Sequence, residues 1–153
     1  MKASHTPYYF IVGAVVVAAS LIPIPYLASP KWDVLVVDDA SSPIEGMTVR
    51  STYQDYSTET NGHEEDKQTD KNGHTSFQAH QSSASIVRRV MFTLLSARAG
   101  VHASFGRHAS LFVFGRGRQG SAVSGQYVMD WTGTPTEVKT RITVTRFRDS
   151  IQR

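Results

Sequence analysis

The chain has 153 residues, 40% of them hydrophobic and 19% charged, a balance typical of one folded domain and not of a disordered segment. It contains no cysteine, which excludes a disulfide framework, a thiolate zinc site, a cysteine nucleophile and a lipidated N-terminal cysteine. The formal net charge is +3, but residues 32–71 hold ten acids and three bases, whereas residues 72–153 hold three acids and eleven bases.

An uncharged apolar stretch runs from Tyr8 to Pro25. It lacks the polar face that a core helix would show, so we expect an apolar helix that serves as a membrane segment. Its length lies between that of a signal-peptide core and that of a bilayer-spanning helix, so a retained transmembrane anchor and a cleaved signal both remain open. The residues that represent this segment are Tyr8, Phe10, Val15, Leu21 and Pro25.

A proline-rich link follows this segment. Pro23, Pro25 and Pro30 predict a stiff, non-helical connection. The chain therefore divides into an anchor or signal segment with its linker over 1–30 and a folded domain over 31–150. Either interpretation of the apolar segment predicts that the folded domain lies outside the cytoplasm, in the periplasm or at the cell surface.

The first half of the folded domain has the patterns of β-strands. Trp32–Val37 is a short β-branched run and Met47–Tyr56 alternates apolar and polar residues, so we expect two neighbouring strands. Ser57–Gln68 is polar and acidic and predicts an exposed loop or hairpin tip. Thr69–Gly73 predicts a turn, and Thr75–His80 a further strand.

Between Ser83 and Gly100 the pattern changes to that of a helix. Ser82 or Ser83 can cap its start and Gly100 its end. We expect an amphipathic helix packed on the sheet, with a strand through 90–95 as the alternative. The apolar residues that share one half of the helical wheel are Ile86, Val87, Val90, Met91, Leu94 and Leu95, and Phe92 falls on the other half.

The last third returns to β patterns. Val101–Phe114 predicts a strand with a bulge at Gly106 and a central part over 111–114. Gly115–Gly125 predicts a flexible basic loop, Tyr127–Trp131 a strand, and Glu137–Phe147 the clearest strand of the chain. About seven short strands with regular turns predict a mainly β fold, a transthyretin-like or immunoglobulin-like sandwich with one inserted helix.

Two stretches of the sequence resemble the carboxypeptidase regulatory-like family. The first runs from Val34 to Val49 and includes Gly46, and the second runs from Thr69 to Phe77 and includes Asp70 and Gly73. The resemblance implies a transthyretin-like sandwich of the type found on bacterial exported proteins, with Gly46, Asp70 and Gly73 forming turns. It also implies an accessory or binding role at the cell envelope, without catalytic residues.

The candidate chemical residues are sparse. His102 and His108 could share a strand face and bind zinc with His74 or His80, but no metal-binding spacing supports this. No nucleophile elbow or phosphate loop is present in the sequence. We therefore assign no catalytic residue, no cofactor and no metal ligand, and a histidine-dependent metallohydrolase is the least favoured function.

The segregated charges suggest a partner surface. It comprises the acids Glu64, Glu65 and Asp66 and the bases Arg116, Arg118, Lys139 and Arg141, although charges of opposite sign could equally attract each other or remain solvated. Few aromatic residues accompany the bases, and the export segment argues against nucleic acid. We expect a non-catalytic module held at the membrane or exported, with a protein or envelope polymer as partner. The alternative is a structural subunit of a cell-surface assembly.

Overall fold

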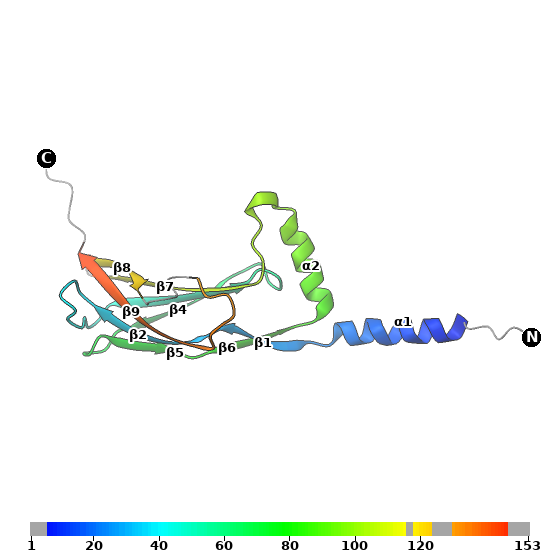
Figure 1. Ribbon diagram of the computed structural model, residues 1–153, viewed down its shortest axis with the longest axis horizontal. Coiled ribbons are helices and arrows are strands. Elements are labelled where there is room, and N and C mark those ends of the chain that lie inside the picture. The colour runs from blue at the N-terminus through cyan, green and yellow to red at the C-terminus, as the bar shows by residue number, and fades with distance from the viewer. Residues whose placement is uncertain (1–5, 116–117, 124–129, 147–153) are drawn as a thin grey trace, which may run out of the picture.

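The protein is described by a computed structural model that covers residues 6–115, 118–123 and 130–146 (Figure 1). These residues form a mainly β structure, which confirms the mainly β part of the expected fold. The elements in chain order are α1 (Thr6–Leu21), β1 (Ile24–Ser29), β2 (Lys31–Val37), β3 (Thr48–Asp55), β4 (His63–Gln68), β5 (His74–Phe77), β6 (His80–Ala84), α2 (Ile86–Ala97), the 3-10 helix η1 (Gly100–His102), β7 (Arg107–Gly115), β8 (Arg118–Val123) and β9 (Glu137–Arg146).

One seven-stranded sheet carries the core, in the order β4-β3-β7-β8-β9-β2-β5. Strands β2 and β9 run parallel, and the other neighbours in this sheet are antiparallel. Side chains of β2, β5 and β9 meet side chains of β3 and β7 in a single buried cluster, so the sheet bends around a common core. The buried members are Trp32, Val34, Val36, Met47, Val49, Phe77, Ala109, Leu111, Val113, Trp131, Val138, Ile142 and Val144.

The expected pairing of the first two strands is wrong. Strand β2 pairs with β5 and β9, whereas β3 pairs with β4 and β7. The connection between them turns at Asp38, whose carboxylate accepts the backbone N–H groups of Ala40 and Ser42. Alternation fixes which side of a strand is buried, but it leaves the choice of neighbour to contacts distant in sequence.

The turn before β5 is confirmed. The Asp70 carboxylate accepts the backbone N–H groups of Asn72 and His74, both at 2.8 Å. Gly73 has φ +73°, and a Cβ there would lie 2.5 Å from the Val36 carbonyl oxygen. Gly46 likewise has a positive φ of 70°. Glycine suits both positions because other residues rarely adopt this conformation.

Several segments predicted as loop or linker are strands. Residues 24–29, expected in the proline-rich linker, form β1 and pair with β6 as a separate two-stranded sheet. Proline is compatible with such an edge strand because no neighbour requires its missing N–H. Residues 63–68 of the expected acidic loop form β4, and residues 118–123 of the expected basic loop form β8 between β7 and β9.

The strand expected over 101–114 begins only at Arg107, because η1 and Gly106, with φ +76°, precede it. Within β7 the apolar run alternates: Leu111 and Val113 are buried, whereas Phe112 and Phe114 are exposed. Most of the expected strand over 127–131 lies outside the described residues. In β9 the apolar residues Val138, Ile142 and Val144 are all buried, in keeping with the alternating pattern of that strand.

Candidate interaction surface

Helix α2 turns its polar face toward the strands. The Arg88 Nε–H donates to the Thr58 carbonyl oxygen (2.7 Å), and the Ser96 hydroxyl donates to the Tyr56 carbonyl oxygen (3.1 Å). Arg89 forms an ion pair with the Asp55 carboxylate (3.4 Å). These contacts repeat along one side of the helix, so they fix which face points inward.

The helix begins two or three residues later than expected. Its N-cap is Ser85, whose hydroxyl accepts the Arg88 backbone N–H, and not Ser82 or Ser83. Ser82 and Ser83 belong to β6, whose pairing with β1 holds them in extended backbone. The expected helix is therefore confirmed over 86–97, and the alternative strand through 90–95 is wrong. The helix also ends earlier than expected, at the C-cap Arg98 and not at Gly100.

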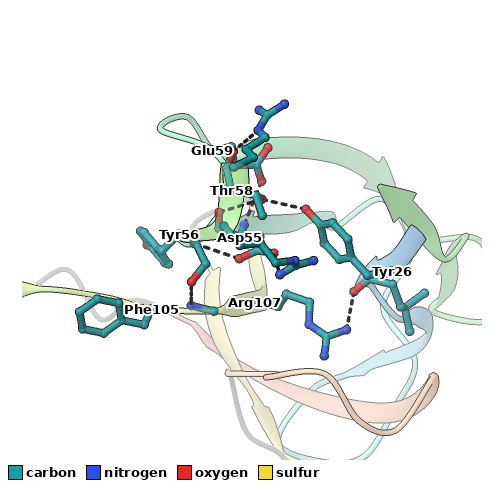
Figure 2. Close-up of polar contacts among 12 residues, drawn as sticks. Tyr26, Asp55, Tyr56, Thr58, Glu59, Phe105 and Arg107 are labelled. Carbon is teal, nitrogen blue, oxygen red and sulfur yellow. Dashed lines mark hydrogen bonds and ion pairs between the residues drawn. The ribbon is translucent and has the colours of Figure 1, made fainter. Parts of the chain in front are cut away.

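The polar contacts of α2 are made with the turn that follows β3, residues 55–59, drawn in Figure 2. We call this turn the root of α2. The Asp55 side chain is fully buried, and its Oδ1 accepts the Ser57 backbone N–H at 3.0 Å. The Glu59 carboxylate accepts the Asp55 backbone N–H at 2.9 Å. A buried carboxylate is costly unless its oxygens are paired, so this turn is a specific structure that depends on Asp55.

The same turn is tied to β1, and β1 in turn is tied to β7. The Tyr26 hydroxyl contacts the Thr58 hydroxyl at 2.8 Å, and the Arg89 guanidinium lies 4.4 Å from the centre of the Tyr26 ring. Arg107 donates to the Leu27 carbonyl oxygen at 3.0 Å. Figure 2 shows Tyr26, Asp55 and Arg107 converging from three different strands. The root of α2 is therefore part of the folded body.

The apolar face of α2 is uncovered, contrary to the expectation that it packs on the sheet. No residue of α2 is buried. Phe92, which the wheel places among the polar residues, is the half-buried side chain that turns inward, beneath Arg88. A helical pattern shows which residues share a face, but it does not show which face turns inward. In α2 the hydrogen bonds to backbone carbonyl oxygens turn the polar face inward. The outward apolar residues are Ile86, Val87, Val90, Met91, Leu94 and Leu95, 44–65% exposed.

Helix α1 is apolar on all sides. It extends away from the sheet along the long axis of the molecule, and its C-terminal end contacts α2 (Figure 1). The predicted membrane residues Tyr8, Phe10, Val15 and Leu21 lie in α1 with 57–75% of their surface exposed, and Pro25 lies in β1. Among the described residues, no helix combines the length and the apolarity needed to cross a membrane.

The predicted charged surface is divided. Glu64 and Asp66 form ion pairs with Arg50 of the neighbouring strand at 3.0 and 2.8 Å. The Arg50 guanidinium holds the pKa of the Asp66 carboxyl below its usual range. The bases Lys139 and Arg141 lie on β9, which is not a neighbour of β4 in the sheet.

The remaining members of that surface are dispersed as well. Glu65 contacts Lys67 at 3.2 Å and His80 at 3.4 Å. Arg118 begins β8, and Arg116 lies outside the described residues. The charge pattern predicts a single surface for these residues, but the strand order does not bring the acids and the bases together.

A groove of about 720 Å³, with polar and apolar lining in nearly equal parts, lies along β3, β4 and β7. It is lined by Tyr53 and His63, and by His108, whose ring nitrogens contact Asp130 (2.9 Å) and the Phe105 carbonyl oxygen (3.0 Å). The Tyr53 ring is stacked with both His63 and His80, and burial raises its pKa. The groove offers aromatic faces and hydrogen-bonding groups to a polar ligand.

The histidines do not form the arrangement that a zinc site would require. His102 lies in η1 and His108 in β7, so the two do not share a strand face. Within the described part of the chain, no three His, Asp or Glu side chains are close enough to hold a metal ion.

Sequence reasoning missed the residues that anchor α2. Asp55, Thr58 and Arg89 were not singled out, although Asp55 followed two residues later by Ser57 is the spacing of an Asx turn. That signal locates a turn. It does not reveal that Arg89, 34 residues later, approaches the same carboxylate.

Comparisons with known proteins yield little for this chain. No family model matches it, and no curated protein matches it. Among solved structures it is similar to 3-chlorocatechol 1,2-dioxygenase from Rhodococcus opacus 1CP, with 13% identity and a TM-score of 0.44 over 78% of this chain. The chain covers 61% of that enzyme's length. A likeness at this level carries no inference about fold or activity.

Proposed function

We propose that the protein is a non-catalytic β-sandwich module, of the carboxypeptidase regulatory-like type, held at a membrane by its N-terminal apolar segment. The module faces the extracytoplasmic side and binds or presents a protein or an envelope polymer. One observation carries this proposal: the side chains around α1 are apolar and exposed, with Phe10 75% exposed. Exposed apolar surface of this extent is unfavourable in water and marks an interaction site.

Fractionation of the full-length protein, expressed in a bacterium, tests this proposal. We expect the protein in the membrane pellet, resistant to alkaline carbonate. The variant Val15→Arg/Val16→Arg places two charges in α1, so it should appear in the soluble fraction with the same fold by circular dichroism. N-terminal sequencing separates a retained anchor from a cleaved signal. A wild-type protein found only in the soluble cytosolic fraction would contradict the proposal.

The second candidate function is a structural subunit of a cell-surface assembly. The observation that favours it is the uncovered apolar face of α2, which resembles a subunit contact in composition. This candidate predicts concentration-dependent association of the chain with itself. Analytical ultracentrifugation of the protein in nanodiscs tests it, and a monomer at high concentration would argue against it.

A further inference from the structure

We propose that the outward face of α2, with the loop that follows it, rests on the surface of an anionic lipid bilayer beside α1. This inference rests on the proposed membrane attachment and adds how the folded body is oriented on the membrane. The contact surface comprises Val87, Val90, Met91, Leu94, Arg98 and Val101.

The composition of this surface matches a bilayer interface. Leu94 is 65% exposed at the centre of the outward face, and Val101 in η1 is 96% exposed. The segment 86–105 contains no acid. Of its arginines, Arg88 and Arg89 bind the folded body, and Arg98, the C-cap of α2, is exposed. An apolar stripe flanked by arginine is the pattern of a helix that lies in the headgroup region, where anionic lipids attract the bases.

The direction of the two helices agrees with this placement. Figure 1 shows α1 leaving the sheet along the long axis, while α2 rises across that direction from the end of α1. If α1 enters the bilayer along its normal, α2 therefore lies close to the membrane plane. Its polar side is held to the body through Thr58 and Tyr56, so the apolar side faces away from the sheet.

The contacts of α2 with the body make this orientation rigid. Arg89 reaches the buried Asp55, and Arg88 and Ser96 donate hydrogen bonds to backbone carbonyl oxygens of the turn after β3. A loosely attached helix could rotate its apolar face toward the sheet in water. The anchors oppose that rotation, so the apolar face stays available to a surface outside the protein.

Single-cysteine labelling tests the inference, because the natural chain contains no cysteine that would interfere. Full-length Leu94→Cys is labelled with an environment-sensitive fluorophore and reconstituted into vesicles of phosphatidylcholine and phosphatidylglycerol. The matched control is Asn72→Cys, an exposed turn position next to the end of β2 opposite α1. Quenching by aqueous iodide and by lipid with a nitroxide near the headgroup is measured for both.

We expect iodide quenching at position 94 to be at least about threefold weaker than at position 72, and nitroxide-lipid quenching to be strong at 94 and weak at 72. In vesicles without phosphatidylglycerol, or with Arg98→Glu, the protection at 94 should decrease. Equal iodide quenching at both positions in vesicle-bound protein would overturn the inference. Protection from iodide without nitroxide quenching would also overturn it, because a protein surface would then cover α2.

Flotation of the same samples keeps the two proposals separate. If neither labelled protein floats with the vesicles, the proposed membrane attachment through α1 fails. If both float and position 94 remains open to iodide, the attachment stands and the role of α2 fails. The substitutions lie on exposed side chains, so neither result can be attributed to loss of the fold.

Discussion

Replacing Asp55 with alanine should loosen the attachment of α2 to the body. The carboxylate is fully buried, and its two oxygens serve different partners: Oδ1 accepts the Ser57 backbone N–H and Oδ2 pairs with Arg89. The Asp55→Ala variant leaves that N–H without its acceptor, and a hydrogen bond to a charged group contributes about 1.5–3 kcal/mol. The Arg89 pair is long and one-third exposed on the arginine side, so solvent screening reduces its share to about 0.5 kcal/mol.

The expected loss in unfolding free energy is therefore about 2–3.5 kcal/mol. Asp55→Asn keeps an oxygen acceptor for Ser57 and should lose only about 1 kcal/mol. Asp39, which is exposed, provides the control, because Asp39→Ala should change stability by less than about 0.5 kcal/mol.

Urea unfolding followed by tryptophan fluorescence measures these differences, and hydrogen exchange of 86–97 reports the loosening of α2. We expect amide exchange in α2 to accelerate more than exchange in β2 and β9, because the anchor is local to the helix root. An Asp55→Ala protein as stable as Asp39→Ala, with unchanged exchange in α2, would refute the role assigned to this carboxylate.

Three further substitutions test the fold and its ionisable groups. Gly73→Ala should lower the thermal midpoint by about 10 °C or more, measured by circular dichroism, because its Cβ would lie 2.5 Å from the Val36 carbonyl oxygen at a φ of +73°; an unchanged midpoint would contradict this. Trp131→Ala should cost about 3–5 kcal/mol in urea unfolding, because the ring is buried and its N–H donates to the Pro135 carbonyl oxygen. Burial and the nearby Glu59 raise the pKa of Tyr53, so the unfolded chain loses this proton first and stability falls as pH rises above about 10. Tyr53→Phe should show a smaller fall between pH 9 and 11 in the same assay, and identical pH profiles would exclude that contribution.

The sequence correctly predicts those parts of the fold that depend on contacts between residues close together in the chain. The Asp70 and Gly73 turn depends on hydrogen bonds within five residues, and the inward residues of β9 follow from strict alternation. Strand pairing is different, because β2 takes its neighbours from far along the chain. Trp32 lies opposite Phe77, 45 residues later, and Lys31 lies opposite Glu137, 106 residues later. Such distances are not encoded in the residues that flank the strand.

Strand β8 shows a second limit of pattern reading. Residues 118–123 carry glycine, serine and arginine, which are typical of a loop. They form a strand because β7 and β9 lie on either side and supply partners for the backbone groups. Hydrogen bonds on both edges satisfy the backbone whatever the side chains prefer, so tertiary context overrides the local preference.

The orientation of α2 links the fold to the proposed function, because it leaves an apolar face exposed. Turning its apolar face inward would bury four large side chains, Val87, Val90, Met91 and Leu94, each worth about 1.5–3 kcal/mol when fully covered. The polar contacts that hold this face outward, made by Arg88, Ser96 and Arg89, contribute about 0.5–1.5 kcal/mol each.

In water alone, the free energy lost by leaving the apolar face exposed therefore exceeds the free energy of the polar contacts by several kcal/mol. The balance reverses when a low-dielectric layer covers the outward face, because the apolar side chains are then removed from water without breaking any tie to the body. The bilayer proposed next to α1 would supply such a layer without a second protein chain. On this reasoning, Leu94→Ser should weaken vesicle binding more than it weakens folding, since the side chain stabilises the contact with the lipid and contributes little to the core.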